Sequence, residues 1–390
     1  MGIKRLTMRA LIAVGVLLVA DQIAFYTVLR DGLFFGRPVA PFDPPLFSPA
    51  QMEGLARIER ALATGDPDPK KLRFDAELGW HNLPGGGFGE FRYDWAGCRI
   101  GARPLSRTKE PGVRRLVAVG CSMTHGDEVK ATETWCAQLD EARSDLEVAN
   151  LGVSAYGIDQ ALLRLRRDGL PLQPDVVCLG LLPGAVLRLT SLYRPALRHW
   201  SRDVAFKPRF RLDASDELEL VPNPARTLAD IPRLIRDQRA FLEAFSEHDH
   251  WLRRARSAYA PRGTHWMHAL FATRVGLSLY EAGGRDTQAC FKNPAHGIYR
   301  LLKAVVLETR AVASEAEAEF LFLILPGRAV LSVGSYWDGF VQELRSEGVE
   351  VLDFSEILRG APPDRLFAPL GHYGPEFSRI VAETLAEHLR

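Results

Sequence analysis

The sequence has almost no excess of charge of either sign. Its 390 residues include 49 basic and 48 acidic side chains, which gives a formal net charge of +1. Proteins that bind nucleic acids are usually basic, because contacts to phosphate supply much of their affinity. The composition therefore gives no support for a nucleic-acid partner, and we expect none.

Patterned cysteines and metal-binding clusters are also lacking. The five cysteines are widely separated and contain no CxxC pair: Cys98, Cys121, Cys136, Cys178 and Cys290. This spacing supports neither a disulfide framework nor a thiolate zinc site. The run His248-Asp249-His250 lies in a polar stretch that is more typical of a solvated helix face. The glycine-rich LPGGGFGEF lacks the frame of a phosphate loop, so we expect no metal and no cofactor.

One long hydrophobic run is present near the start of the chain. Ala10 to Leu29 is interrupted only by Asp21 and Gln22, and basic residues precede it at positions 4, 5 and 9. About 20 apolar residues span a bilayer, and the flanking positive charge places the N-terminus in the cytoplasm. A cleaved signal peptide is the alternative, although Leu18-Val19-Ala20 makes a poor cleavage site. We predict an anchor over residues 1–30 in the inner (cytoplasmic) membrane, crossing once, with the bulk of the chain in the periplasm.

The composition changes twice after this run. Residues 31–71 contain clustered prolines and predict an extended tether with a short helix around Met52 to Ala63. Residues 72–112 carry scattered aromatic side chains and glycines, which predict a small β-layer leading into the core. The main domain is expected over residues 113–390.

Short apolar runs alternate with amphipathic segments from Arg114 onward. The runs are RRLVAVG, LEVANLGV, DVVCLGLL, EFLFLILP and VEVLDF. Buried strands separated by helices predict an α/β fold with a doubly wound, five-stranded parallel sheet. Residues 188–294 break this rhythm and contain only a candidate hairpin, FKPRFRLDASDELELVPNP. They predict a long insertion after strand three.

Three loops that follow strands carry residues suited to chemistry. Ser122 follows the first strand, Gly152 follows the second, and His372 precedes the last helix. The carboxyl ends of parallel strands meet at one edge of a sheet, where ligands bind. A serine nucleophile needs a base such as histidine, yet Ser122 is equally suited to cap a helix. The residues alone leave both interpretations open.

These motifs resemble those of the SGNH/GDSL-type serine hydrolases, specifically the membrane-anchored bacterial form associated with envelope polysaccharide. The similar segments, from Gly79 to the C-terminus, are GW, VAVGCSMTHGDEV, VANLGVSAYGIDQALLRL, QPDVVCLG, YRP, KPRF and GHYGPEFSRIVAE. The resemblance implies a flavodoxin-like sheet of the SGNH hydrolase type. It also implies Ser122 as nucleophile and first oxyanion donor, Gly152 as second oxyanion donor, and His372 as base.

The chain departs from the family pattern at three places. Cys121 stands where the family has an aspartate before the serine, and Gly184 or Ala185 stands where an asparagine completes the oxyanion hole. Pro369 and Leu370 occupy the place of the aspartate that orients the histidine.

A replacement for the missing acid must then come from elsewhere. Asp364 is the candidate substitute acid, and a backbone carbonyl is another possible partner of the imidazole. Glu376 and Asp353 are less suitable.

Two functions of different classes follow from the resemblance. The first is an exported serine esterase or acyltransferase that acts on an O-acylated carbohydrate through an acyl-enzyme formed by Ser122 and His372. The alternative is a catalytically degenerate protein of the same fold that binds glycan or an envelope assembly partner. A lipid-facing hydrolase is a third hypothesis, suggested by the apolar stretch Met267 to Tyr280. Stretches of this kind more often pack as amphipathic helices.

Overall fold

The structure is a computed structural model that describes residues 2–28, 33–34, 37–38, 49–65, 72–197, 203–245, 247–251, 270–273, 275–276 and 287–390. The chain divides into two compact units. The first comprises residues 1–56, 195–204 and 232–286, and the second comprises residues 57–194, 205–231 and 287–390.

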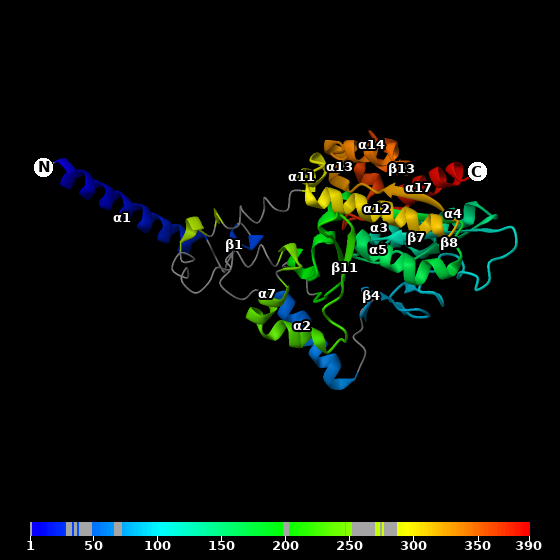
Figure 1. The fold of residues 1–390 in the computed structure, drawn as a ribbon, viewed down its shortest axis with the longest axis horizontal. Helices are drawn as coiled ribbons and strands as arrows, with labels where there is room; N and C mark the ends of the chain where they lie inside the picture. Colours follow the sequence, from blue (N-terminus) through cyan, green and yellow to red (C-terminus); the bar gives the residue numbers. More distant parts are fainter. Residues whose placement is uncertain are drawn as a thin grey trace. The chain divides into compact units, whose positions relative to one another are not determined.

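A five-stranded parallel sheet forms the centre of the second unit (Figure 1). Its strands are β7 (Arg114–Gly120), β8 (Leu146–Asn150), β9 (Val176–Leu181), β12 (Glu319–Ile324) and β13 (Glu350–Asp353). The spatial order is β13-β12-β9-β7-β8, so the strand order reverses between β7 and β9. The predicted doubly wound, five-stranded sheet is confirmed, and its crevice lies at the carboxyl ends of these two strands.

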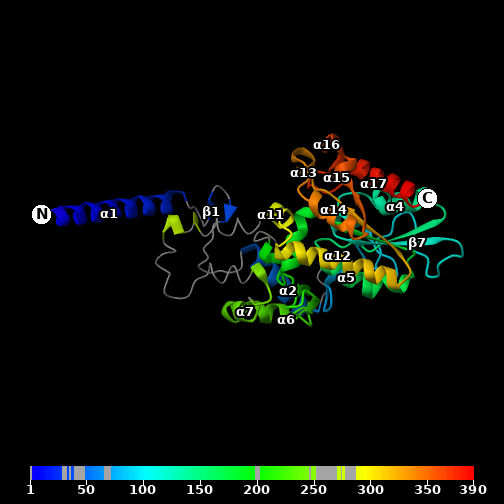
Figure 2. The same cartoon turned by 45° about the horizontal axis from the view of Figure 1, so that its top comes forward.

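Helices cover both faces of this sheet (Figure 2). On one face lie α4 (Trp135–Ala142) and α17 (Pro375–His388), and on the other lie α5 (Ile158–Arg164) and α12 (Gly297–Glu315). The strands are buried from both sides, and for this reason their sequences are continuous apolar runs rather than alternating ones.

The remaining elements of the second unit are short. The helices are α3 (Ser122–His125), α11 (Thr287–Lys292), α13 (Arg328–Val333), α14 (Asp338–Ser346), α15 (Phe354–Ile357) and α16 (Pro363–Leu366). The 3-10 and π segments are Ala131–Glu133, Leu165–Gly169, Leu170–Leu172, Pro183–Thr190 and, across the unit boundary, Arg194–Leu197. The residues of helices α2 (Pro49–Thr64) and α6 (Asp230–Arg236) are divided between the two units.

The segment before the core forms two antiparallel strand pairs. One joins β3 (Leu72–Asp75) to β4 (Gly79–Asn82), and the other joins β5 (Gly87–Phe88) to β6 (Phe91–Arg92). Strand β4 lies against the loop after β8, because the Asn82 side chain donates to the Gly152 carbonyl at 2.9 Å and the Trp80 indole donates to the Ser154 carbonyl at 3.0 Å.

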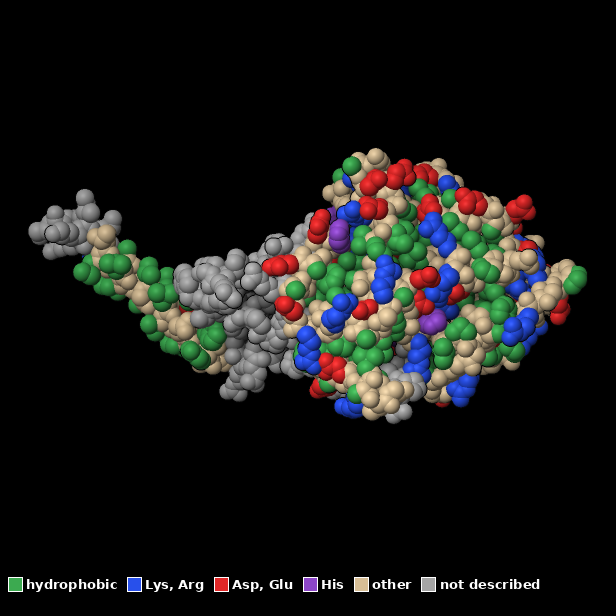
Figure 3. Space-filling view, turned by 60° about the horizontal axis from the view of Figure 1, so that its bottom comes forward, with side chains coloured by type: hydrophobic (Ala, Val, Ile, Leu, Met, Phe, Trp, Pro, Cys, Tyr) green, Lys and Arg blue, Asp and Glu red, His purple; other side chains and the backbone are tan. Residues whose placement is uncertain are grey.

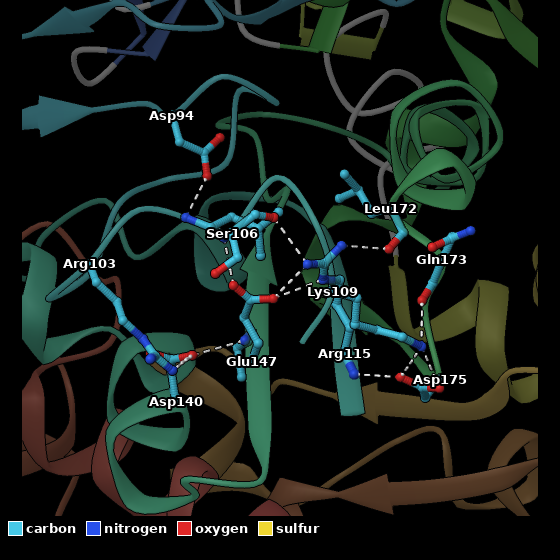
Figure 4. Close-up of polar contacts among 12 residues, drawn as sticks. Asp94, Arg103, Ser106, Lys109, Arg115, Asp140, Glu147, Leu172, Gln173 and Asp175 are labelled. Atoms are coloured by element: carbon cyan, nitrogen blue, oxygen red, sulfur yellow. Dashed lines mark hydrogen bonds and ion pairs between the residues drawn. The ribbon is translucent and has the colours of Figure 1, made fainter. Parts of the chain in front are cut away.

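The amino end of the sheet is held by a buried ion pair (Figure 4). The Arg115 guanidinium of β7 donates to Glu147 of β8 at 2.7 Å and to the Leu172 carbonyl at 2.8 Å. Burial raises the pKa of Glu147, but hydrogen bonds from Ser106 and Arg115 outweigh it and hold that pKa below its usual range. This cluster lies at the opposite end of β7 from Ser122, so its role is structural.

The insertion after β9 contains the predicted hairpin. It pairs β10 (Arg209–Leu212) with β11 (Leu218–Val221). Just before it, a fully buried ion pair joins Lys207 to Asp159 of α5, which fixes the start of the hairpin to the core. The apolar stretch Met267 to Tyr280 lies largely outside the described residues.

The first unit contains α1 (Gly2–Val28), β1 (Leu33–Phe34), β2 (Arg37–Pro38) and α7 (Gln238–Phe245). Residues Thr7–Val28 of α1 are long and apolar enough to cross a membrane, and hydrophobic side chains dominate the visible surface of this helix (Figure 3). The Asp21 carboxylate accepts the backbone N–H groups of Phe271 at 2.7 Å and Ala272 at 2.8 Å. An acidic side chain within the apolar helix is thus bound by the chain's own backbone.

Candidate active site

Ser122 lies at the carboxyl end of the central strand. Strand β7 ends at Gly120, Cys121 caps the next helix, and Ser122 is the first residue of α3. The glycine is required here, because a Cβ at Gly120 would lie 2.3 Å from the Thr124 hydroxyl oxygen. At this position the Ser122 N–H has no intrahelical acceptor, and Ser122 is buried, with 5% of the residue exposed.

His372 reaches Ser122 from a tight loop before α17. An isolated bridge pairs Phe367 with Tyr373, and the Ala368 N–H donates to the His372 carbonyl at 2.8 Å. The Tyr373 hydroxyl donates to the Pro326 carbonyl at 3.0 Å, which ties this loop to the end of β12. The His372 Nε2 atom lies 3.0 Å from the Ser122 Oγ.

Glu128 lies on the other side of the imidazole. Its Oε2 atom is 2.8 Å from the His372 Nδ1 and also accepts the His372 backbone N–H at 2.8 Å. Its Oε1 atom accepts the Leu370 N–H at 2.9 Å. A carboxylate can only accept, so Nδ1 carries the proton and Nε2 is left to accept from the Ser122 hydroxyl. Ser122, His372 and Glu128 therefore form a continuous hydrogen-bonded chain with the polarity of a serine-hydrolase triad.

The surroundings of Glu128 favour its charged form. Burial raises the pKa of its carboxyl, but the backbone N–H groups of His372 and Leu370 and the His372 side chain outweigh burial and hold that pKa below its ordinary value. A carboxylate in this state can stabilise a positive imidazolium next to it.

The other acidic candidates lie elsewhere. Asp364 is on α16, where its exposed carboxylate pairs with Arg328. Asp353 is buried and accepts from the Trp337 indole at 2.7 Å, and Glu376 is exposed in the first turn of α17. The prediction of Asp364 as the substitute acid is therefore replaced by Glu128, which contacts the His372 imidazole from a different loop.

The N–H of Gly152 is already engaged. It donates to the Asn150 side-chain oxygen at 3.0 Å, so it is not available as the second oxyanion donor that the resemblance implied. Glycine is needed here for packing, because a Cβ would lie 2.4 Å from the His125 backbone nitrogen. Gly152 thus lets the loop after β8 press against α3.

Ala155, in the same loop, has a left-handed backbone conformation, whereas Gly152 does not. Its φ is +67°, a left-handed value that is uncommon for alanine. Within the described part of the chain its N–H has no acceptor. The loop lies beside Ser122, since the Val153 N–H donates to the Gly120 carbonyl at 3.1 Å and Tyr156 lines a cavity together with Cys121.

The place of the expected oxyanion asparagine is apolar. Ala185, in the 3-10 segment after β9, lines a cavity of about 10 Å³ beside Cys121, and Gly184 is exposed next to it. Neither residue has a side chain that donates a hydrogen bond. This position therefore supplies no side-chain donor to an oxyanion.

Sequence reasoning missed Glu128, although it lies within the motif that identified Ser122. It stands six positions after the serine in VAVGCSMTHGDEV. Gly126, with a φ of +82°, ends α3 in the left-handed conformation and turns the chain back toward the sheet edge. The pair of acidic residues Asp127-Glu128 that follows this helix-ending glycine is the signal that could have suggested it.

No group of three or more His, Cys, Asp or Glu side chains that could hold a metal ion occurs among the described residues. Asp249, from the histidine-rich run, is buried and accepts the Trp251 N–H at 2.8 Å.

No protein-family model matches the chain, and a comparison with curated proteins finds no match. Solved structures similar to it include a lipolytic protein of the G-D-S-L family from Desulfitobacterium hafniense, with 14% identity, 70% of this chain and 98% of that chain covered, and a TM-score of 0.34. A lipase/acylhydrolase from Enterococcus faecalis has 12% identity, with 71% and 95% covered and a TM-score of 0.35. A two-domain esterase active on acetylated mannans has 11% identity, with 71% and 49% covered and a TM-score of 0.33.

Proposed function

We propose that this chain is a serine esterase or acyltransferase that acts on O-acylated carbohydrate. The observation that carries the proposal is the hydrogen-bonded chain Ser122, His372 and Glu128, with 3.0 Å and 2.8 Å between the paired atoms. The carbohydrate class follows from the family that the sequence motifs resemble.

The arrangement supports a two-step acyl transfer. The Ser122 Oγ attacks the ester carbonyl carbon while His372 Nε2 takes its proton, and the Glu128 carboxylate stabilises the imidazolium that results. Collapse of the tetrahedral intermediate breaks the bond to the sugar oxygen, which receives the proton from His372. The acyl group stays on Ser122 until water or a second hydroxyl group, deprotonated by His372, attacks it.

The oxyanion of the intermediate needs hydrogen-bond donors. We assign them to the backbone N–H groups of Ser122 and Ala155, because the N–H of Gly152 is bonded to Asn150 and Ala185 offers no side-chain donor. Loss of one such donor typically costs ~10²–10³ in kcat, so an enzyme without the asparagine is expected to turn over slowly.

The site is proposed to act in the periplasm, beside the inner membrane. Support comes from the length and apolar composition of α1 and from the basic residues before it. Reporter fusions after Pro69 test this placement. A periplasm-dependent reporter should be active there, and activity of a cytoplasm-dependent reporter would reverse the orientation.

The full-length chain in detergent micelles tests the chemistry. An activated aryl acetate should be cleaved, and a fluorophosphonate should label Ser122. Ser122→Ala should abolish both signals. The degenerate alternative, favoured by the apolar Ala185, predicts neither signal in the wild type but retained binding to an acetylated envelope glycan.

A further inference from the structure

The carboxylate of Asp127 joins two loops of the proposed site. It follows Gly126 and directly precedes Glu128. Its Oδ1 atom lies 2.7 Å from the His125 Nδ1, and the Ser154 hydroxyl donates to Oδ1 at 2.8 Å and to Oδ2 at 2.7 Å. One side chain thus links the loop that carries Glu128 to the loop that carries Ala155.

His125 anchors the first of these contacts. Its side chain is fully buried, and its Nε2 atom lies 3.2 Å from the Tyr93 hydroxyl. The Arg99 guanidinium donates to the His125 carbonyl at 2.8 Å, to the Gly126 carbonyl, and to the Val129 carbonyl at 2.7 Å. The Arg99 side chain, from the β-layer of residues 72–112, therefore holds the backbone on both sides of Glu128.

Ser154 anchors the second contact. Its carbonyl accepts the Trp80 indole N–H at 3.0 Å while its hydroxyl is bound to Asp127. The next residue is Ala155, whose left-handed φ of +67° is a conformation that the surroundings must enforce. Fixing Ser154 on two sides fixes the direction in which the Ala155 N–H points.

We infer that Asp127 is a positioning residue that aligns the Ala155 N–H and the Glu128 carboxylate through Ser154 and His125. This rests on the proposed function, since it concerns the same acyl transfer. Asp127 acts through these neighbours, because its carboxylate contacts them rather than the paired atoms of Ser122 and His372. A displacement of about 1 Å at a reacting centre can cost ~10²-fold in rate. The set of contacts that Asp127 makes with His125 and Ser154, called the brace below, is therefore a determinant of kcat.

Ser154→Ala is the sharpest test, because it removes one hydroxyl and leaves Asp127 and His125 in place. Aryl acetate hydrolysis by the full-length protein should lose about 10-fold to 100-fold in kcat, with KM unchanged. Ser154→Thr, which keeps the hydroxyl, should restore most of that loss. Asp127→Ala should act in the same direction, and Asp127→Asn should be mild because its side-chain oxygen still accepts from both partners.

A readout independent of activity separates the two proposals. The Trp80 indole N–H donates to the Ser154 carbonyl, which belongs to the same peptide unit as the Ala155 N–H. Hydrogen exchange at this indole should accelerate in Ser154→Ala and remain at the wild-type rate in Ser154→Thr. If the wild type shows no Ser122-dependent turnover while exchange responds in this way, the proposed function fails but the brace stands. The brace is overturned if Ser154→Ala keeps wild-type exchange at the Trp80 indole, or if it keeps wild-type kcat in an active protein and lowers only thermal stability.

Discussion

Glu128 Oε1 accepts the backbone N–H of Leu370 at 2.9 Å. Leu370 is one of the two residues that replace the expected orienting aspartate, so the carboxylate from the loop after α3 lies against the backbone from which an aspartate side chain would have projected. A different part of the chain thus supplies the carboxylate at the same imidazole nitrogen.

Replacing Glu128 by glutamine should lower kcat while keeping a side chain of the same size beside His372. The amide cannot supply the negative charge that stabilises the imidazolium, and loss of a triad acid can lower kcat by up to ~10⁴. Steady-state hydrolysis of an aryl acetate measures this. Asp364→Asn is the matched control, since Asp364 is exposed and paired with Arg328, and it should leave kcat unchanged. Equal effects of the two substitutions would remove Glu128 from the mechanism.

Moving the acid back to its expected position should rescue the site. In a Glu128→Ala background, Leu370→Asp places a carboxylate on the loop of His372, and we expect at least about 10-fold of the lost kcat to return. Leu370→Asn in the same background controls for shape. With Glu128 present, Leu370→Asp should give no gain, because two carboxylates would then compete for one imidazole. A rescue that Asn reproduces would count against an electrostatic role.

The left-handed backbone of Ala155 predicts an unusual effect of glycine. Ala155→Gly should raise the free energy of unfolding by about 0.5–1 kcal/mol, because glycine adopts a positive φ without the Cβ clash. Urea denaturation in detergent measures it. Gly152→Ala is the contrasting variant and should destabilise by about 1–3 kcal/mol, since its Cβ would lie 2.4 Å from the His125 nitrogen. Destabilisation by Ala155→Gly would contradict the strain.

The depressed pKa of Glu128 predicts part of the acid sensitivity of the fold. A carboxyl whose folded pKa lies below its ordinary value of 4.5 adds stability that is complete above that pH. The contribution is lost as the pH falls through the folded pKa. The difference in Tm between the wild type and Glu128→Gln should therefore be constant from pH 6 to 8 and shrink below about 4.5. A difference that grows on acidification would show the opposite linkage.

The sheet was predictable because strands buried on both faces must be apolar throughout, and the five runs from RRLVAVG to VEVLDF satisfy that condition. Ser122 and His372 were identifiable because the motifs around them, VAVGCSMTHGDEV and GHYGPEFSRIVAE, resemble those of a known family. Their separation of 3.0 Å agrees with the prediction that they meet at one edge of the sheet.

The partners of these residues depend on tertiary contacts that local sequence does not encode. Glu128 becomes the partner of His372 only because Gly126 reverses the chain and the loop of residues 367–373 folds over it. The N–H of Gly152 is lost to the Asn150 side chain, a contact that a motif comparison by position does not reveal. For the same reason Ala155 attracts no notice in the sequence, since only its φ distinguishes it.

The contact between Asp21 and the amides of Phe271 and Ala272 sets an order of events in biosynthesis. The partners lie 250 and 251 positions further along the chain, so at about 5–20 residues per second they emerge roughly 12–50 s after the aspartate. In the proposed topology α1 enters the bilayer while its carboxylate still lacks these two donors, and a charged side chain within a membrane helix is costly. If α1 is the anchor proposed here, its insertion therefore precedes the docking of the 271–272 segment on Asp21, and the two steps are separate in time.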